Sequence, residues 1–412
     1  AMLGLAAGVI GSYLLFRKRA LFGDTISHAM LPGVVGAFLL MRALGGDGKS
    51  FAVLLCGAAI AGTLAALIIP LLRRMTGLKD DCVMGIVLGV GFGLGVSMLG
   101  VAQALPGGNQ AGLESFIYGR TASMVQGDAI AIGVISLVTL AIAVLVAKEF
   151  RLLCFDETFG RALGRPEGLL DFGLMLLAVT VTVVGLQAVG LILIIALLII
   201  PASAARFWTE DLNRLVTISG LIGVVACWLG ASISAMAPKL PAGSIIVLTL
   251  AGCFAVSMSF GIRGGAVWRF LQTARLRRRT ARQHLLRAAA EALEISGEDS
   301  WSIDALAGSR SWSLAKLQRL HRRCHRHGDI DRTGDRWFLT SQGSVVAERV
   351  LRNHRLWEIF LMRHADIAAS HVDRDADLVE HVLSPEIITE LESLLDRGDG
   401  TLGSPHPIGS DA

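Results

Sequence analysis

Long apolar segments follow one another along the first 262 residues and then stop. Most are roughly 17–22 residues long, enough for a helix rising 1.5 Å per residue to cross about 30 Å of hydrocarbon. The segments cover about 1–16, 24–42, 51–71, 83–101, 127–147, 168–186, 187–205, 215–236 and 244–262. The pattern predicts an all-α polytopic membrane bundle of about nine spans. Because the first segment is short and has no polar residues before it, we expect further native residues upstream.

Charge divides the chain at the same place. About one residue in nine is charged in 1–262, against more than one in four in 263–412. Nine of the ten histidines lie in the second part, and His28 is the exception. A hydrophobic content of 53% excludes a disordered chain and a single soluble enzyme. The six cysteines are isolated from one another, which argues against a disulfide scaffold or a zinc ribbon.

The basic residues between the apolar segments predict the orientation. Alternate connections are rich in Lys and Arg, whereas the others carry few or none. Because basic loops stay on the cytoplasmic side, nine spans place the C-terminus in the cytoplasm of a plasma (inner) membrane protein. The basic connections carry Arg17, Lys18, Arg19, Arg73, Arg74, Lys79, Lys148, Arg151, Arg161, Arg165, Arg206 and Arg214.

Two ionisable residues stand at the start of the second apolar segment. On a helix, Asp24 and His28 share one face at i,i+4 spacing, and Ser27 lies next to them. A carboxylate with a neutral imidazole is a ligand set for Mn²⁺, Fe²⁺ or Zn²⁺, and Pro32-Gly33 should interrupt the helix, as in helices that line a pathway. The alternative is a helix N-terminus at the membrane surface, with Asp24 as its cap.

The polar part begins with a basic juxtamembrane helix that we expect to face lipid headgroups. Helices are predicted at 284–294, near 302–308 and at 313–326, followed by a two-stranded wing turned at Thr333-Gly334. This order predicts a winged helix-turn-helix. Its third helix carries four arginines that either contact nucleic-acid phosphates or form a solvated face, namely Arg319, Arg322, Arg323 and Arg326.

The first part resembles the permease subunits of manganese, zinc and iron ABC importers. The likeness rests on Arg17 to Asp24 with Ser27 to Gly33, on Phe155 to Gly164, and on Val184 to Arg206. It implies that Asp24, Ser27 and His28 belong to the metal pathway. It also implies a coupling helix that docks on a separate ATPase, formed by Phe155, Asp156, Arg161, Ala162 and Gly164. The implied partners are a second permease copy or a related permease, ATPase subunits and an extracytoplasmic metal-binding protein.

The second part is similar to metal-dependent repressors of the diphtheria-toxin-repressor and manganese-regulator type. The likeness rests on Leu339 to Gly343, Arg352 to Leu361, Asp377 to Ser384 and Gly403 to Pro407, and it covers about 281–408. It implies a regulatory metal held by His354, Glu358, Asp377, Glu380 and His381. The family's ligand on its first helix has no clear counterpart around His284–Glu291.

Together these patterns predict a translocation subunit for a divalent transition metal, with Mn²⁺ favoured over Fe²⁺ and Zn²⁺. It is not an enzyme, and no cofactor is bound permanently; the metal is both cargo and regulatory ligand. The predicted domains are a transmembrane domain at 1–262, a linker helix at 263–280, a winged-helix domain at 281–345 and a helical metal-sensing domain at 346–412. The rival hypotheses are a membrane-tethered DNA-binding regulator and an ATP-independent secondary transporter.

Overall fold

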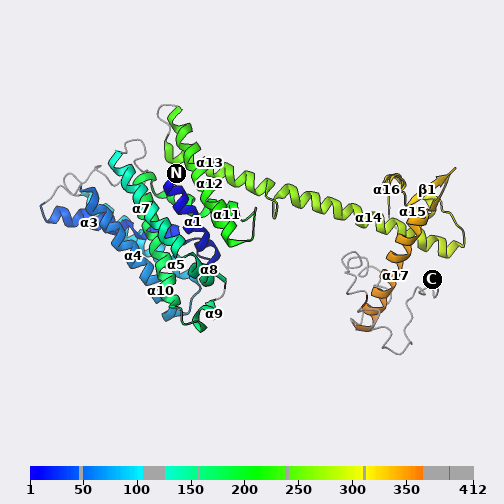
Figure 1. Cartoon of the computed structure of the whole chain (residues 1–412), viewed down its shortest axis with the longest axis horizontal. Helices are drawn as coiled ribbons and strands as arrows, with labels where there is room; N and C mark the ends of the chain where they lie inside the picture. The colour runs from blue at the N-terminus through cyan, green and yellow to red at the C-terminus, as the bar shows by residue number, and fades with distance from the viewer. Residues whose placement is uncertain are drawn as a thin grey trace. The chain divides into compact units, whose positions relative to one another are not determined.

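The chain forms two units, Ala1–Arg269 and Phe270–Ala412, which are described separately. The computed structural model describes residues 1–45, 50–104, 126–155, 157–236, 241–309, 312–364 and 389. Nearly all of these residues are helical, and one small sheet lies in the second unit (Figure 1).

Apolar helices make up the first unit, in the order that the sequence predicts. Seven helices of the described part are long and apolar enough to cross a membrane, with α2 and α3 counted as one, and α1 and α11 are shorter apolar helices. The elements are α1 (Met2–Phe16), α2 (Phe22–Ala29), α3 (Leu31–Ala43), α4 (Phe51–Thr76), α5 (Asp80–Ala104), α7 (Gln126–Leu145), α8 (Ala147–Phe155), α9 (Glu157–Ala162), α10 (Glu167–Val189), α11 (Leu191–Ala205), α12 (Leu212–Met236) and α13 (Ala242–Phe260). The predicted number of nine spans stays a prediction.

The short helix α1 lies in the core of this unit. It is buried along most of its length and packs on α11 and α12. A Cβ added at Gly4 would overlap the carbonyl oxygen of Gly223, and one at Gly8 would overlap that of Ser219. The Ser219 hydroxyl donates to the Gly8 carbonyl over 2.8 Å. Small residues therefore let α1 and α12 approach backbone to backbone, as membrane helices do.

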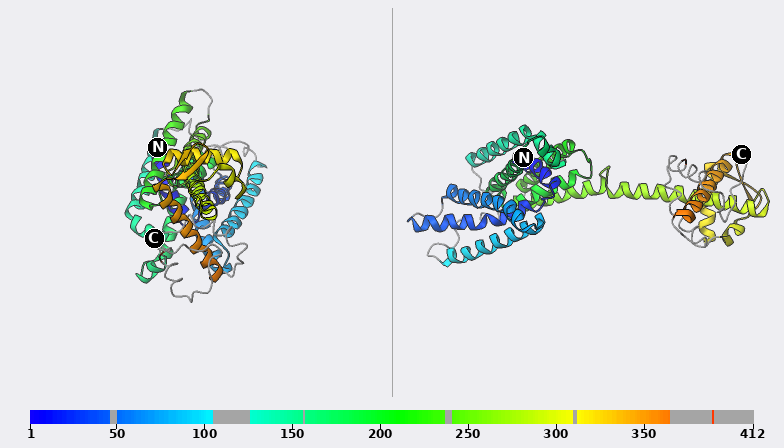
Figure 2. Two further views of the ribbon diagram at one scale, coloured as in Figure 1. Left: turned by 90° about the vertical axis from the view of Figure 1, so that its right-hand side faces the viewer. Right: turned by 90° about the horizontal axis from the view of Figure 1, so that it is seen from below.

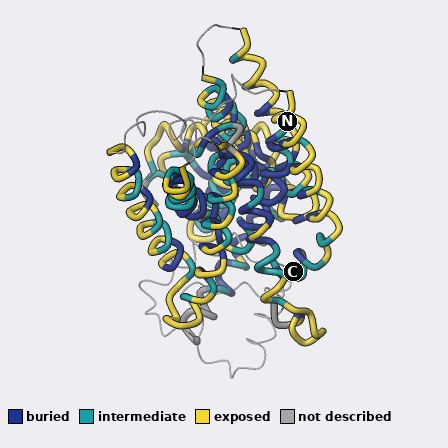
Figure 3. Tube along the Cα trace, turned by 90° about the vertical axis from the view of Figure 1, so that its left-hand side faces the viewer, coloured by how far each residue is buried: buried dark blue, intermediate teal, exposed yellow. Residues whose placement is uncertain are grey.

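The outside of the first unit is apolar. In Figure 3 the buried stretches gather in the middle and the exposed stretches surround them. Exposed leucine, isoleucine and valine side chains continue along α4, α5, α7 and α12. Helices α3, α4 and α5 lie side by side (Figure 2). A soluble domain does not expose this much apolar surface, and helices that are apolar on every face are typical of a membrane.

The second unit begins within a helix that is longer than the sequence analysis predicts. A basic helix and a separate helix at 284–294 were expected, but α14 (Ala266–Ser296) is continuous. The physical reason is that neither glycine nor proline occurs within it, and the first breaker is Gly297 with φ 65°. The remaining elements are α15 (Ile303–Ser309), α16 (Leu314–His327), β1 (Ile330–Thr333), β2 (Arg336–Leu339) and α17 (Ser341–His364).

A small core and a hairpin define the second unit. Leu286 on α14, Trp301, Leu317 on α16 and Trp337 on β2 meet in its core. Strands β1 and β2 pair antiparallel around a two-residue loop, Gly334-Asp335, one residue beyond the predicted turn, because the positive φ of Gly334 suits the first loop position. The order of helices and hairpin follows the prediction. The assignment as a winged helix-turn-helix stays a prediction.

Candidate metal pathway

The second apolar segment is a broken helix. Helix α2 ends at Ala29 and α3 starts at Leu31, so the break falls at Met30, just before the predicted Pro32-Gly33. Pro32 lies in the first turn of α3, where its missing N–H costs no helical hydrogen bond. Gly33 packs directly on Gly57 of α4, leaving no room for a side chain at either position. This local chemistry interrupts the helix between α2 and α3 at one residue, Met30, which keeps helical dihedral angles of φ −74° and ψ −24°.

Asp24 and His28 lie one turn apart on α2. The Nε2 atom of His28 is 3.3 Å from Oδ1 of Asp24, and the two side chains are 26% and 31% exposed. Two ligand atoms that each bind one ion at about 2.1 Å, at angles between octahedral and tetrahedral, are about 3.0–3.4 Å apart. The pair therefore has the spacing of two ligands of a single transition-metal ion.

Neighbouring elements hold the imidazole in place. The ring of Phe92 on α5 meets the ring of His28 edge to face, with centroids 5.1 Å apart. Next to it, Gly91 lies directly against the backbone of Ala29. Because α5 approaches α2 this closely, the imidazole is restricted on the α5 side while its Nε2 atom faces Asp24.

Ser27 occupies a different position from the pair. Its side chain is buried, and its hydroxyl donates to the carbonyl of Gly23 over 2.7 Å. The hydroxyl oxygen keeps lone pairs, but its proton is used within the helix. In the described part of the chain, no three or more His, Cys, Asp and Glu residues come together as a candidate metal site. Among the residues that the structure describes, Asp24 and His28 thus stand as a pair rather than as part of a larger ligand cluster.

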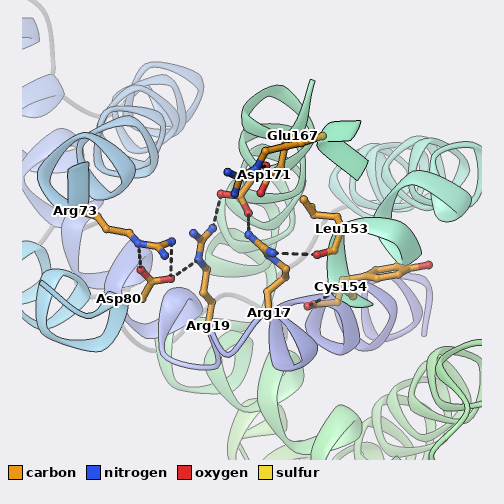
Figure 4. Close-up of polar contacts among 10 residues, drawn as sticks. Arg17, Arg19, Arg73, Asp80, Leu153, Cys154, Glu167 and Asp171 are labelled. Atoms are coloured by element: carbon orange, nitrogen blue, oxygen red, sulfur yellow. Dashed lines mark hydrogen bonds and ion pairs between the residues drawn. The ribbon is translucent and has the colours of Figure 1, made fainter. Parts of the chain in front are cut away.

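A cluster of arginines and aspartates joins the basic ends of several helices (Figure 4). Asp171 on α10 accepts hydrogen bonds from Arg17 over 3.1 Å and from Arg19 over 2.7 Å. Asp80 at the start of α5 lies 3.2 Å from Arg19 and 3.0 Å from Arg73 of α4. The network ties the α1–α2 connection to α4, α5 and α10, and Arg19 within it is only 3% exposed. Such a buried ionic network fixes helix ends relative to one another.

The predicted coupling segment lies beside this cluster. Arg17 also donates to the carbonyl of Leu153 on α8 over 2.9 Å, which links α8 to the network. Phe155 at the end of α8 is exposed, with its ring 5.6 Å from that of Phe16. Arg161 on α9 forms an ion pair with Glu167. Of the other predicted coupling residues, Ala162 ends α9 and Gly164 takes a positive φ in the turn that follows, whereas Asp156 lies outside the described residues.

In the second unit, the four predicted arginines of α16 come together. Arg319, Arg322, Arg323 and Arg326 line one exposed hollow with Lys316 and Ser313. The opposite side of the helix is buried through Leu317, His321 and Cys324. The helix is therefore amphipathic, with one basic face in solvent.

The predicted regulatory ligands are described only in part. His354 on α17 is buried, with its Nδ1 atom 2.5 Å from Nη1 of Arg287 on α14. Glu358 belongs to α17, but its side chain lies outside the described residues, as do Asp377, Glu380 and His381. An imidazole whose nitrogen accepts from a guanidinium does not fit a metal ligand in this arrangement.

Sequence reasoning missed several of these residues. Asp171 lies one turn inside a predicted span, and Arg287 lies within a helix predicted only from its apolar positions. A carboxylate inside an apolar segment was the available signal for Asp171, whereas Arg287 is one of many charges in its half of the chain and had no such signal. The exposed apolar side chains of Phe159 and Leu163, beside the predicted coupling residues, were also not singled out.

Long apolar helices with basic ends define a polytopic helical membrane protein, and comparisons with known proteins make this specific. Residues 1–261 match the ABC 3 transport family, and the chain belongs to that family. Residues 340–400 match the iron dependent repressor, metal binding and dimerisation domain.

Individual relatives agree with this assignment. The chain is 36% identical over 375 residues to the manganese transport system membrane protein MntC of Bacillus subtilis, covering 91% of this chain and 85% of the relative. It is 39% identical to the zinc transport system membrane protein TroC of Treponema pallidum, over 66% of this chain and 90% of the relative. Among solved structures, PsaBC from Streptococcus pneumoniae in complex with Fab matches with a TM-score of 0.54 and 31% identity, over 66% of this chain and 91% of that one.

Proposed function

We propose that this chain is the permease subunit of an ABC importer that moves a divalent transition metal into the cytoplasm, with Mn²⁺ favoured. The observation that carries the proposal is the 3.3 Å separation of His28 Nε2 and Asp24 Oδ1 on a broken, partly exposed helix. One hard and one borderline ligand suit Mn²⁺, Fe²⁺ and Zn²⁺ alike. Relatives named for manganese and for zinc transport support the class of cargo. The choice of Mn²⁺ rests on the carboxylate-rich ligand set predicted for residues 263–412, the tail of the chain.

A second permease chain adds ligands to the pathway. Two copies of the permease around a common axis bring the Asp24–His28 pair to the pore twice, which doubles the ligands from two to four. Related permeases can provide the second copy as a heterodimer. A metal-loaded binding protein delivers the ion from outside, and the chain's C-terminus lies in the cytoplasm with the basic helix ends.

The ATPase docks on the segment around α8 and α9. In support of this, Phe155, Phe159 and Leu163 expose large apolar side chains there. Through Leu153 and Arg17 the same segment is bonded to Asp171 of α10. A displacement of α8 by the ATPase therefore pulls on the network that also holds Arg19, three residues before α2. This is how ATP hydrolysis in a separate subunit reaches the metal pair.

The tail adds regulation. Its predicted ligands His354, Glu358, Asp377, Glu380 and His381 respond to internal metal and inhibit further import. Changing His381 to Ala leaves uptake intact and relieves inhibition by preloaded metal. Unchanged inhibition in that variant contradicts this role.

A second function is favoured by one observation, the exposed basic face of α16. A winged helix-turn-helix with four arginines on its third helix suits a membrane-tethered DNA-binding regulator. A gel-shift experiment on detergent-solubilised full-length protein, with and without Mn²⁺, separates the two functions. A metal-dependent shift with operator DNA supports the regulator, and no shift supports a tail that acts only on transport.

The importer is tested by radiolabelled Mn²⁺ uptake into vesicles that contain the permease and its ATPase, with and without ATP. Wild type is compared with Asp24→Ala and His28→Ala, and with Asp128→Ala as a matched acidic control on the exposed start of α7. The expected result is ATP-dependent uptake that the two pathway variants lose while remaining folded. Uptake without ATP supports a secondary transporter instead.

A further inference from the structure

A fully buried arginine faces the buried histidine of the tail. Arg287 on α14 has no exposed surface, and its Nη1 atom is 2.5 Å from Nδ1 of His354 on α17. Its Nε atom lies 2.9 Å from Oε1 of Glu291, one turn further along α14. The guanidinium thus bridges a carboxylate and an imidazole in the interior of the second unit. This is the position of a cation that both groups bind.

The contact decides which lone pairs His354 can offer. A guanidinium has only N–H donors and stays protonated in proteins, so Nδ1 of His354 must be the acceptor. A neutral imidazole has one acceptor nitrogen, and its other nitrogen carries the proton. With Arg287 bound at Nδ1, the proton is on Nε2. Neither nitrogen of His354 then has a lone pair for a metal ion.

Charge gives the same result independently. A divalent ion bound to this imidazole would lie within a few ångströms of the guanidinium, where low polarity strengthens the repulsion between like charges. Arg287 cannot relieve the repulsion by losing its proton, as a lysine could. The guanidinium and the metal are therefore mutually exclusive at His354.

We propose that Arg287 is a built-in competitor for divalent metal at His354, so that metal binds this histidine only when the guanidinium leaves it. The inference rests on the proposed role of His354 as a regulatory ligand and adds what sets its threshold. The guanidinium of Arg287 is always close to His354, so it raises the metal concentration that is needed for binding at this histidine. Import is then inhibited only when internal metal is abundant.

The test measures Mn²⁺ binding to the full-length chain in lipid nanodiscs, from the loss of the free-ion paramagnetic resonance signal. Four proteins are compared: wild type, Arg287→Gln, His354→Gln and the double variant. Binding that His354→Gln removes is assigned to the tail, which separates it from the membrane pathway. In Arg287→Gln this binding should occur at an Mn²⁺ concentration lower by at least about tenfold. The double variant should match His354→Gln alone.

A matched control is Arg355→Gln. Arg355 follows His354 on α17 and pairs with Glu294 of α14 over 2.5 Å, so its loss breaks a similar interhelical ion pair without changing the imidazole. It should leave Mn²⁺ binding as in wild type. If Arg287→Gln does not fold, Arg287→Met keeps the unbranched stem and repeats the test.

Three results overturn the inference, and they are distinguishable. Equal His354-dependent binding in wild type and Arg287→Gln contradicts the competition while leaving His354 a ligand. Tighter binding in Arg355→Gln as well shows that loosening the helix pair, rather than freeing the imidazole, is the cause. Binding that His354→Gln changes in neither background removes His354 from the proposed regulatory site, and the competition with it.

Discussion

Two histidines of this chain have neighbours of opposite charge: one lies beside a carboxylate and the other beside a guanidinium. His28 has the carboxylate of Asp24 at 3.3 Å and is about a quarter exposed. His354 has the guanidinium of Arg287 at 2.5 Å and is almost completely buried. The first imidazole can share a cation with its neighbour, whereas the second already accepts from one. The residue type alone therefore does not make a metal ligand, and the partner of each ring decides what it can bind.

The same difference matches the tasks proposed for the two units. A transport pair must bind an ion and release it on each cycle, so access and an incomplete ligand shell are advantages. In the proposed regulation His354 must not bind metal at ordinary concentrations, and the competing guanidinium of Arg287 would provide that. Exchanging, removing or loosening the partners of these rings tests the comparison.

The largest effect on transport is expected when the carboxylate beside His28 is replaced by a guanidinium, the kind of group that lies beside His354. In Asp24→Arg the new guanidinium donates a hydrogen bond to the ring of His28 and repels the metal ion. ATP-dependent Mn²⁺ uptake should therefore fall by about 100-fold or more. Asp24→Glu keeps the charge and should retain part of the activity. Both are measured in vesicles with the ATPase present, alongside a folding check by gel filtration. Uptake by Asp24→Arg at the level of Asp24→Glu would contradict the comparison.

The next effect is on stability. Arg287→Met leaves Glu291 without its buried partner and should destabilise the second unit by about 3 kcal/mol in the presence of a chelator. Thermal unfolding followed by the fluorescence of Trp301 and Trp337 measures this. The control is Arg336→Met, because the Arg336–Glu298 pair is about half exposed and should contribute less than about 1 kcal/mol. Equal losses of unfolding free energy in the two variants would show that Arg287 contributes no more to the stability of the second unit than an exposed ion pair does.

Local patterns in the sequence predict much of the fold. Apolar segments lie where the long helices are found, and the i,i+4 spacing of Asp24 and His28 already implies their contact. The hairpin follows from its glycine, with an error of one residue. The continuity of α14 could also have been predicted, since its sequence holds no helix breaker.

Contacts between distant segments could not be predicted in the same way. Arg19 and Asp171 are 152 residues apart, and Arg287 and His354 are 67 apart. Helical periodicity tells which face of a helix is apolar, but not which helix covers it or which polar groups meet there. The ligand role of His354 is implied by the family resemblance and stays a prediction, and the side-chain contact from α14 that brings Arg287 to this ring could not be read from the sequence.

A third histidine shows what happens without a charged partner. His321 on α16 accepts from the indole N–H of Trp301 over 3.0 Å, and its Nδ1 atom donates to the Leu317 carbonyl over 2.9 Å. Burial lowers the pKa of His321 below its usual 6.5. The neutral ring is the stable form in the folded state, so its contribution is present above pH 6.5. That contribution decreases as the pH falls below 6.5.

We therefore expect the second unit to lose up to about 1.4 kcal/mol per pH unit through this group as the pH falls below 6.5, until the folded pKa is reached. His321→Gln should remove this part of the pH dependence. Tryptophan fluorescence during urea unfolding, at several pH values between 5 and 7.5, measures both proteins. An unchanged slope in the variant would mean that another group titrates.

The smallest effect is expected at the neighbour of His28 that is not a ligand. Phe92 meets the imidazole edge to face with centroids 5.1 Å apart, and such ring pairs contribute about 0.5–1.5 kcal/mol beyond area burial. In Phe92→Leu the ring of His28 is less well oriented toward Asp24, so the half-saturating Mn²⁺ concentration should rise by about three- to tenfold. The maximal rate should stay near wild type, because both ligands remain. As a control, Leu94→Ala changes an exposed apolar residue of the same helix and should alter neither value. A fall in maximal rate without a change in half-saturation would instead mean that Phe92 acts on the packing of α5 against α2, and that Asp24 alone fixes the position of the imidazole.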